Sequence, residues 1–150
     1  MKIYNTLILL LLVFTISCKS EAKKANKNIS EIEEVALLDT LQLKMNRGKK
    51  WQVNPETEGG VQKMNAIIKI FKSENSADYN VLGKKLAKQT SYIIKNCNMV
   101  GEPHDQLHVV LVPMLDEISN LKDAKNSIEG EASLAKLEGL IKDYFLYFKL

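Results

Sequence analysis

The stretch Cys97-Asn-Met-Val-Gly-Glu-Pro-His-Asp-Gln-Leu-His108 decides the predicted fold, because it joins two long amphipathic segments through a short connection. Gly101 is a residue at which a helix readily stops, and Pro103 suits the first turn of the next helix. Helices joined by so short a loop pack as antiparallel neighbours. The stretch therefore predicts a helical hairpin that carries Cys97 and both histidines of the chain at its closed end.

Apolar residues recur at helical spacing on both sides of this connection. Upstream, helices are expected from about Asn54 to Lys72, and from a cap at Asp78 to about Asn96. Downstream, they are expected from Pro103 to about Leu121 and from Ser127 to the C-terminus, with a kink at Pro113. The positions expected to face the core are Val61, Met64, Ile67, Ile68, Phe71, Tyr79, Leu82, Leu86, Ile93, Ile94, Cys97, Leu107, Leu111, Met114 or Leu115, Ile118, Leu121, Ile128, Ala132, Ala135, Leu137, Leu140, Ile141, Tyr144, Phe145 and Phe148.

Residues 41 to 53 show a different pattern, in which apolar and polar residues alternate around the turn Asn46-Arg-Gly-Lys49. This alternation predicts a small hairpin or an extended strap ahead of the helices. Trp51 is expected to anchor the strap on the helical core, with a ligand-stacking role as the alternative. Residues 41–150 are therefore predicted to form one all-α domain, an up-down four-helix bundle preceded by the strap.

The first residues predict export from the cytoplasm. Lys2 precedes an unbroken apolar run from Leu7 to Phe14, which is too short to span a membrane and is typical of a secretory signal. The small residues that follow end at Cys18 and resemble the lipobox of bacterial lipoprotein precursors, although Thr15 stands where leucine is usual. The resemblance implies cleavage after residue 17 and acylation of Cys18, for example with palmitate. An ordinary signal peptide that releases a soluble protein is the alternative.

Residues 18–40 are predicted to be a flexible tether that follows the lipidated cysteine. Residues 19–28 contain no apolar side chain larger than alanine, so they cannot bury enough surface to become ordered. The expected location is therefore the cell envelope, with the bundle held on the periplasmic or outer side of a membrane by its lipid.

The candidate site consists of Cys97, Met99, His104 and His108. The two histidines are four residues apart and share one helix face, and the predicted hairpin brings the sulfur atoms to the same end. Thiolate, thioether and imidazole together favour copper, especially Cu(I), whereas zinc has no use for Met99. A b-type haem held by His108 with Met64 or Met99 is a further alternative. So is a purely structural or partner-binding role for the whole stretch.

Other functions find little support in the sequence. The net charge of +3 is small and Arg47 is the only arginine, so no nucleic-acid partner is predicted. The chain contains no glycine-rich phosphate loop and no nucleophile motif, so no enzymatic activity and no catalytic residue are predicted. A protein partner is not identifiable from these patterns.

Overall fold

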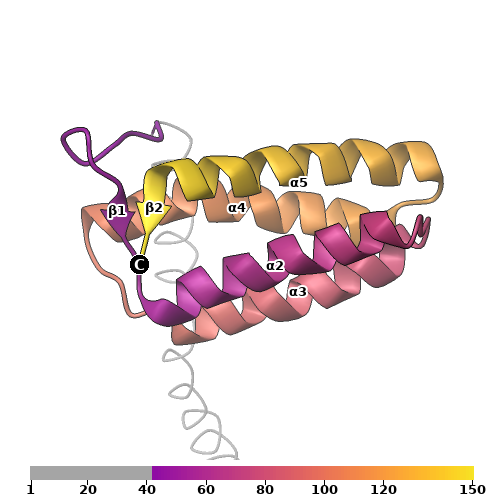
Figure 1. Ribbon diagram of the computed structural model, residues 1–150, viewed down its shortest axis with the longest axis horizontal. Coiled ribbons are helices and arrows are strands. Elements are labelled where there is room, and N and C mark those ends of the chain that lie inside the picture. The colour runs from indigo at the N-terminus through magenta and orange to yellow at the C-terminus, as the bar shows by residue number, and fades with distance from the viewer. Residues whose placement is uncertain (1–41) are drawn as a thin grey trace, which may run out of the picture. The chain divides into compact units, whose positions relative to one another are not determined.

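The computed structural model describes residues 42–150 and shows a four-helix bundle, as predicted (Figure 1). The predicted signal peptide, Cys18 and the tether lie outside the described residues. Consecutive helices contact one another, so the bundle runs up and down. The elements in chain order are β1 (Trp51–Gln52), α2 (Pro55–Ser73), α3 (Tyr79–Asn96), α4 (Glu102–Asp123), α5 (Ser127–Tyr147) and β2 (Phe148–Lys149).

The helix ends lie within a few residues of their predicted positions because capping groups fix them. The Asp78 carboxylate accepts a hydrogen bond from the Val81 amide at 3.0 Å and begins α3. Before α5, the Asn126 side chain accepts from the Glu129 amide, also at 3.0 Å. Gly101 precedes α4 with a φ of 68°, which glycine adopts without strain. Within the described residues, no helix is long and apolar enough to span a membrane.

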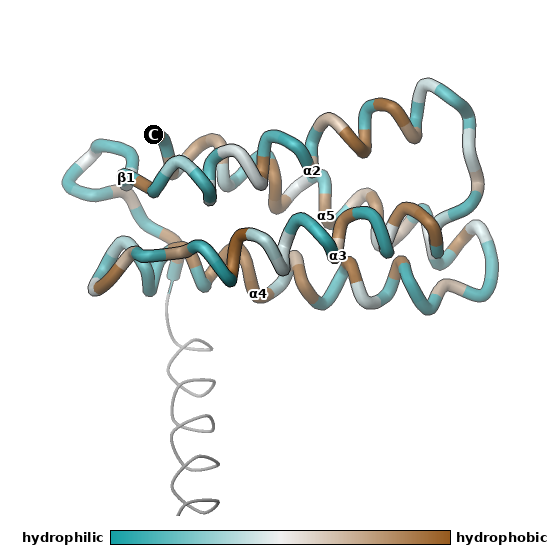
Figure 2. The backbone as a smooth tube through the Cα atoms, turned by 90° about the horizontal axis from the view of Figure 1, so that it is seen from below, coloured by the Kyte–Doolittle hydropathy of each residue, from teal (hydrophilic) through white to brown (hydrophobic). Residues whose placement is uncertain are grey.

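The core lies between the four helices, and polar and apolar residues alternate along each helix around it (Figure 2). Some predicted core positions are wrong: Ile94 is 55% exposed and Ile128 is 80% exposed, and Ala132 and Ala135 also face solvent. The predicted faces of α2 and α4 are the buried ones, and the difference is concentrated in the first half of α5. The buried face of α5 is formed by Gly130, Ser133, Leu134, Leu137, Ile141 and Tyr144.

Thr90 occupies a core position in α3 that was not among the predicted core residues. Its hydroxyl donates a hydrogen bond to the Ala87 carbonyl within the same helix at 3.1 Å. Burial of the hydroxyl is therefore compensated locally, and the stripe continues through this position. In α4 the helix runs through Pro113 without a break, and the predicted kink stays a prediction.

The strap contains the predicted turn, but its strand pairs with a segment that was not foreseen. Asn46 and Lys49 exchange two backbone hydrogen bonds of 2.9 Å, and both residues between them have positive φ, as in a type I′ turn. After the turn, β1 pairs in parallel with β2, placing Trp51 opposite Phe148 (Figure 1). The start and the end of the described chain therefore lie side by side.

Two buried side chains hold the strap on the bundle. Gln106 of α4 accepts a hydrogen bond from the Lys44 amide at 2.7 Å and donates one to the Gln42 carbonyl at 3.2 Å. Trp51 is 4% exposed, and its indole N–H donates to the Lys44 carbonyl at 2.6 Å. The predicted anchoring role of Trp51 is confirmed.

Candidate functional site

The centre of the candidate site is a close contact between Cys97 and His104. Cys97 follows the last turn of α3, where its amide donates to the Ile93 carbonyl at 2.8 Å. His104 lies in the first turn of α4, with its amide bonded to the Gly101 carbonyl at 2.9 Å. Their side chains meet across the connection, with 3.6 Å between Cys97 Sγ and His104 Nδ1. Either atom supplies the hydrogen, depending on the tautomer of the imidazole.

His108 lies one turn further along α4, next to His104. The two imidazole rings are 4.3 Å apart between centroids and inclined by 55°. The four-residue spacing on one helix face causes this contact, as predicted. The structure thus joins the thiol and both imidazoles into a continuous row that runs from the end of α3 along the beginning of α4.

Met99 lies in the connection itself, half-buried and packed against the core, as is Cys97. Both histidines are half-buried as well. All four candidate residues therefore lie at the α3–α4 corner. Within residues 42–150, however, no three side chains of the His, Cys, Asp and Glu types are close enough together to hold a metal ion.

The start of α2 fixes the end of α3 next to Cys97, a feature that the sequence analysis missed. The side-chain NH₂ group of Asn54 donates to the Asn96 backbone carbonyl at 3.0 Å and to the Glu56 carboxylate at 2.7 Å. The side-chain oxygen of Asn54 accepts a hydrogen bond from Thr57 Oγ1 at 2.6 Å. Asn54 was expected only as a helix cap. Its position before a proline marks it as a helix entry, but the bond to Asn96 spans 42 residues of sequence and has no local signal.

The acidic residues at the start of α4 face the strap as well as solvent. Glu102 forms an ion pair of 2.9 Å with Lys44, and both side chains are largely exposed. Such a pair adds little stability in water. Glu102 and Asp105 also lie in the first turn of α4, where the helix dipole favours negative charge.

Two surface pockets of residues 42–150 offer no haem site. One, of about 90 Å³, lies between the end of α2 and the start of α3 and is lined by residues such as Phe71 and Val81. The other, of about 310 Å³, lies by the strap next to Trp51 and Pro103. Neither is lined by a histidine, and Met64 is fully buried in the core. The haem alternative therefore gains no support.

Comparison with protein-family models, with curated protein sequences and with solved structures finds no match to this chain.

Proposed function

We propose that this protein is a lipid-anchored envelope lipoprotein whose helical bundle binds one soft metal ion, Cu(I), at the α3–α4 corner. The single observation that carries the metal proposal is the 3.6 Å separation of Cys97 Sγ and His104 Nδ1. A sulfur and a nitrogen ligand at about 2.3 and 2.1 Å from one ion, at a near-tetrahedral angle, lie about this far apart. The observed separation is therefore that of two ligands sharing one metal ion.

The identity of the metal follows from the neighbours of this pair. Met99 and His108 lie at the same corner and are the candidates for further ligands. A thioether is a soft ligand that suits Cu(I), whereas a structural zinc site uses four cysteine, histidine or carboxylate ligands. Because zinc does not use a thioether ligand, Met99 favours Cu(I) over zinc at this corner. On binding, the Cys97 thiol loses its proton to solvent and its sulfur bonds the metal, with no change of oxidation state.

The copper proposal is tested by anaerobic Cu(I) titration of the mature chain, residues 18–150 with Cys18→Ser, purified without a histidine tag. We expect one Cu(I) per chain, with affinity reduced at least 100-fold in Cys97→Ser and in His104→Ala. Met99→Leu keeps the volume and removes the sulfur, so a smaller loss is expected there. Gln62→Ala, on the exposed surface of α2, is the control. Unchanged affinity in Cys97→Ser would exclude the site.

The lipid anchor is supported by the apolar leader and the small residues that end at Cys18. Metabolic labelling with radioactive palmitate tests it directly. We expect label on the wild-type protein and its partition into detergent, and neither in Cys18→Ser. A labelled Cys18→Ser variant, or an unlabelled wild type with its leader removed, would contradict acylation at this residue.

A second candidate function is docking of a protein partner at the same corner without metal. Val100, in the connection, is 82% exposed, and Ile94, near the end of α3, is 55% exposed. Clusters of exposed large apolar side chains mark interaction sites in other proteins, and these two lie six residues apart in sequence at this end of α3. If this function is the right one, His104→Ala lowers stability without any effect of copper, and Val100→Asp releases a partner that the wild-type protein retains.

A further inference from the structure

Charge is divided sharply between the helices, although the chain as a whole carries only +3. α3 contains four lysines and no acidic residue. α4 contains five acidic residues and one lysine, and α5 contains four acidic residues and two lysines. In α2, three lysines follow two glutamates of the first turn. One side of the bundle is therefore basic and the opposite side acidic.

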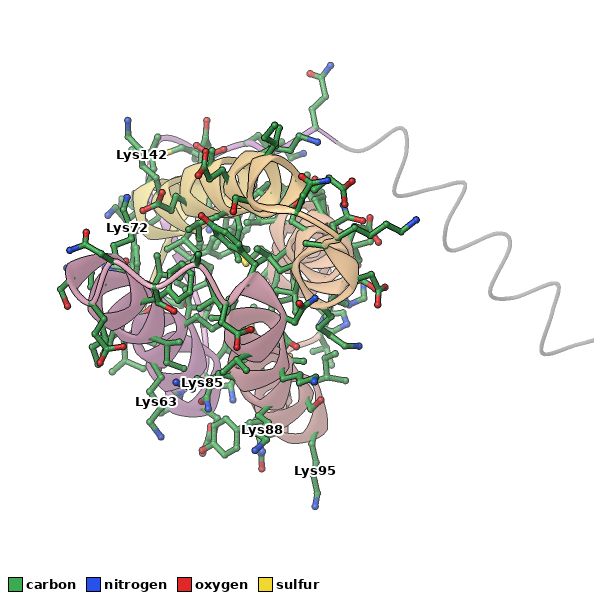
Figure 3. All side chains as sticks on the ribbon, turned by 90° about the vertical axis from the view of Figure 1, so that its right-hand side faces the viewer. Lys63, Lys72, Lys85, Lys88, Lys95 and Lys142 are labelled. Atoms are coloured by element: carbon green, nitrogen blue, oxygen red, sulfur yellow. The ribbon has the colours of Figure 1, made fainter. Side chains whose placement is uncertain are left out.

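The lysines of α3 gather on its outer face. Lys85, Lys88 and Lys95 recur at spacings of three and seven residues, which places them on one stripe of the helix. Figure 3 shows them pointing away from the bundle, with Lys63 of α2 beside them. All four are exposed, and within the described residues no salt bridge engages any of them. Their charge is thus available to a partner.

Apolar side chains lie on the same face between these lysines. Tyr92 and Val81 belong to the lysine stripe of α3 and are 42% and 41% exposed, and Ile70 of α2 is 55% exposed. The Lys63 ammonium lies 5.6 Å from the centre of the Tyr92 ring, which links the two helices at this surface. Lysines and exposed apolar side chains together on one face suit a partner that carries an apolar layer beneath its surface charge.

We propose that this basic face, defined as Lys63, Ile70, Val81, Lys85, Lys88, Tyr92 and Lys95, docks on the surface of an anionic phospholipid bilayer. Lysines attract anionic headgroups, and tyrosine and aliphatic side chains enter the boundary between headgroups and acyl chains. The acidic α4–α5 side then faces away from the bilayer. The biological setting rests on the proposed lipid anchor, which would keep the bundle near a membrane, but the surface itself does not depend on acylation or copper.

Vesicle sedimentation with the unlipidated chain, residues 18–150 with Cys18→Ser, tests the docking face. We expect binding to phosphatidylcholine vesicles that contain phosphatidylglycerol, and no binding to pure phosphatidylcholine. We expect the triple variant Lys85→Gln, Lys88→Gln and Lys95→Gln to bind about 100-fold more weakly, because each lysine contributes about fivefold in affinity. The matched control changes Lys122, Lys125 and Lys142 to Gln, which lowers net charge equally on other parts of the bundle and should leave most of the binding intact.

The apolar part is tested by Ile70→Ser combined with Tyr92→Ser. This pair should remove the binding that persists at 0.5 M salt, where charge attraction is strongly screened. Ile128→Ser with Leu146→Ser, also exposed, is the control and should retain it. Circular dichroism and thermal unfolding confirm that each variant is folded.

Several results would overturn the proposal. Equal weakening by both lysine triples would show that only net charge matters. Equal binding to neutral and anionic vesicles would exclude headgroup recognition. If sedimentation shows a dimer that the Lys85, Lys88 and Lys95 triple dissolves, and no vesicle binding, the face serves a second copy of the chain. Because the unlipidated chain is used throughout, none of these results depends on acylation of Cys18.

Discussion

Gly83 of α3 lies directly against the backbone of Lys122 in α4. A Cβ atom at Gly83 would come within 2.7 Å of the Lys122 nitrogen and 3.1 Å of the Ile118 carbonyl oxygen. Both of these atoms belong to the backbone of a helix, which cannot move aside as a flexible side chain can. The close approach of α3 and α4 at the end of the helix pair opposite their connecting corner depends on the missing side chain.

Gly83→Ala is expected to destabilise the protein by about 2 kcal/mol, because the overpacking cost exceeds the gain in helix propensity. Gly139→Ala in α5 is the control: it has open space around it, so alanine should stabilise by about 0.5–1 kcal/mol. Urea unfolding of both variants measures these free energies. A Gly83→Ala protein more stable than the wild type would show that α3 and α4 are further apart than described.

Gln106→Leu is expected to detach the strap from α4. The substitution leaves the Lys44 amide and the Gln42 carbonyl without their partner, at a cost of about 2 kcal/mol. Trp51 is the only tryptophan, so its fluorescence reports the detachment as a red shift. Gln62→Leu, on an exposed position of α2, should leave the emission unchanged. An unshifted spectrum in Gln106→Leu would mean that other contacts suffice to hold the strap.

Tyr144 should make stability fall at alkaline pH. Its pKa is raised, first by burial and then by the hydrogen bond that its hydroxyl donates to Glu58 at 2.9 Å. Above the unfolded tyrosine pKa of about 10 the unfolded chain loses this proton while the folded chain keeps it, so the free energy of unfolding decreases as pH rises. The expected slope is about 1.4 kcal/mol per pH unit for this proton.

Urea unfolding between pH 8 and pH 11 measures the effect. Tyr144→Phe should be less stable by about 1 kcal/mol at pH 8, through loss of the hydrogen bond, and should show a shallower decline above pH 10. Tyr92→Phe, on the exposed face of α3, is the control and should decline like the wild type. Parallel curves for wild type and Tyr144→Phe would contradict the assignment.

Phe148→Ala is expected to destabilise the protein by about 3–5 kcal/mol. The ring is 2% exposed, stacks on Tyr144 with centroids 5.2 Å apart, and belongs to the strand that pairs with β1. Leu150→Ala, where the side chain is 64% exposed, should stay within about 0.5 kcal/mol of the wild type. Thermal unfolding distinguishes the two. A small effect of Phe148→Ala would show that the strand pair contributes little.

Local patterns in the sequence were sufficient for the helices and for part of the candidate site. Capping residues, apolar periodicity and the short Gly101–Pro103 connection act between near neighbours, so they predicted four helices and placed Cys97 close to His104. The predicted ends at Asp78 and Ser127 are confirmed. Metal binding by Cys97, Met99, His104 and His108, and acylation of Cys18, stay predictions.

Features that depend on distant partners could not be read from the sequence. Whether a glycine or a threonine lies in the core depends on the neighbouring helix: Gly83 faces Lys122, and a Cβ atom at Gly130 would collide with the ring of Tyr79. From the local sequence alone, glycine and threonine are expected only to lower helix stability, because their helix propensity is low. The pairing of Trp51 with Phe148 likewise joins segments that have no common local signal.

The parallel pairing of β1 with β2 also sets the order of events during synthesis. The Val53 amide bonds the carbonyl of Lys149, the next-to-last residue, at 2.9 Å. This contact can close only after α2 to α5 and the segment that follows them have been synthesised, and the entropy of closing so long a loop slows it further. A chain cut short before β2 would therefore leave the strap without the strand that fixes it, although all four helices would be present.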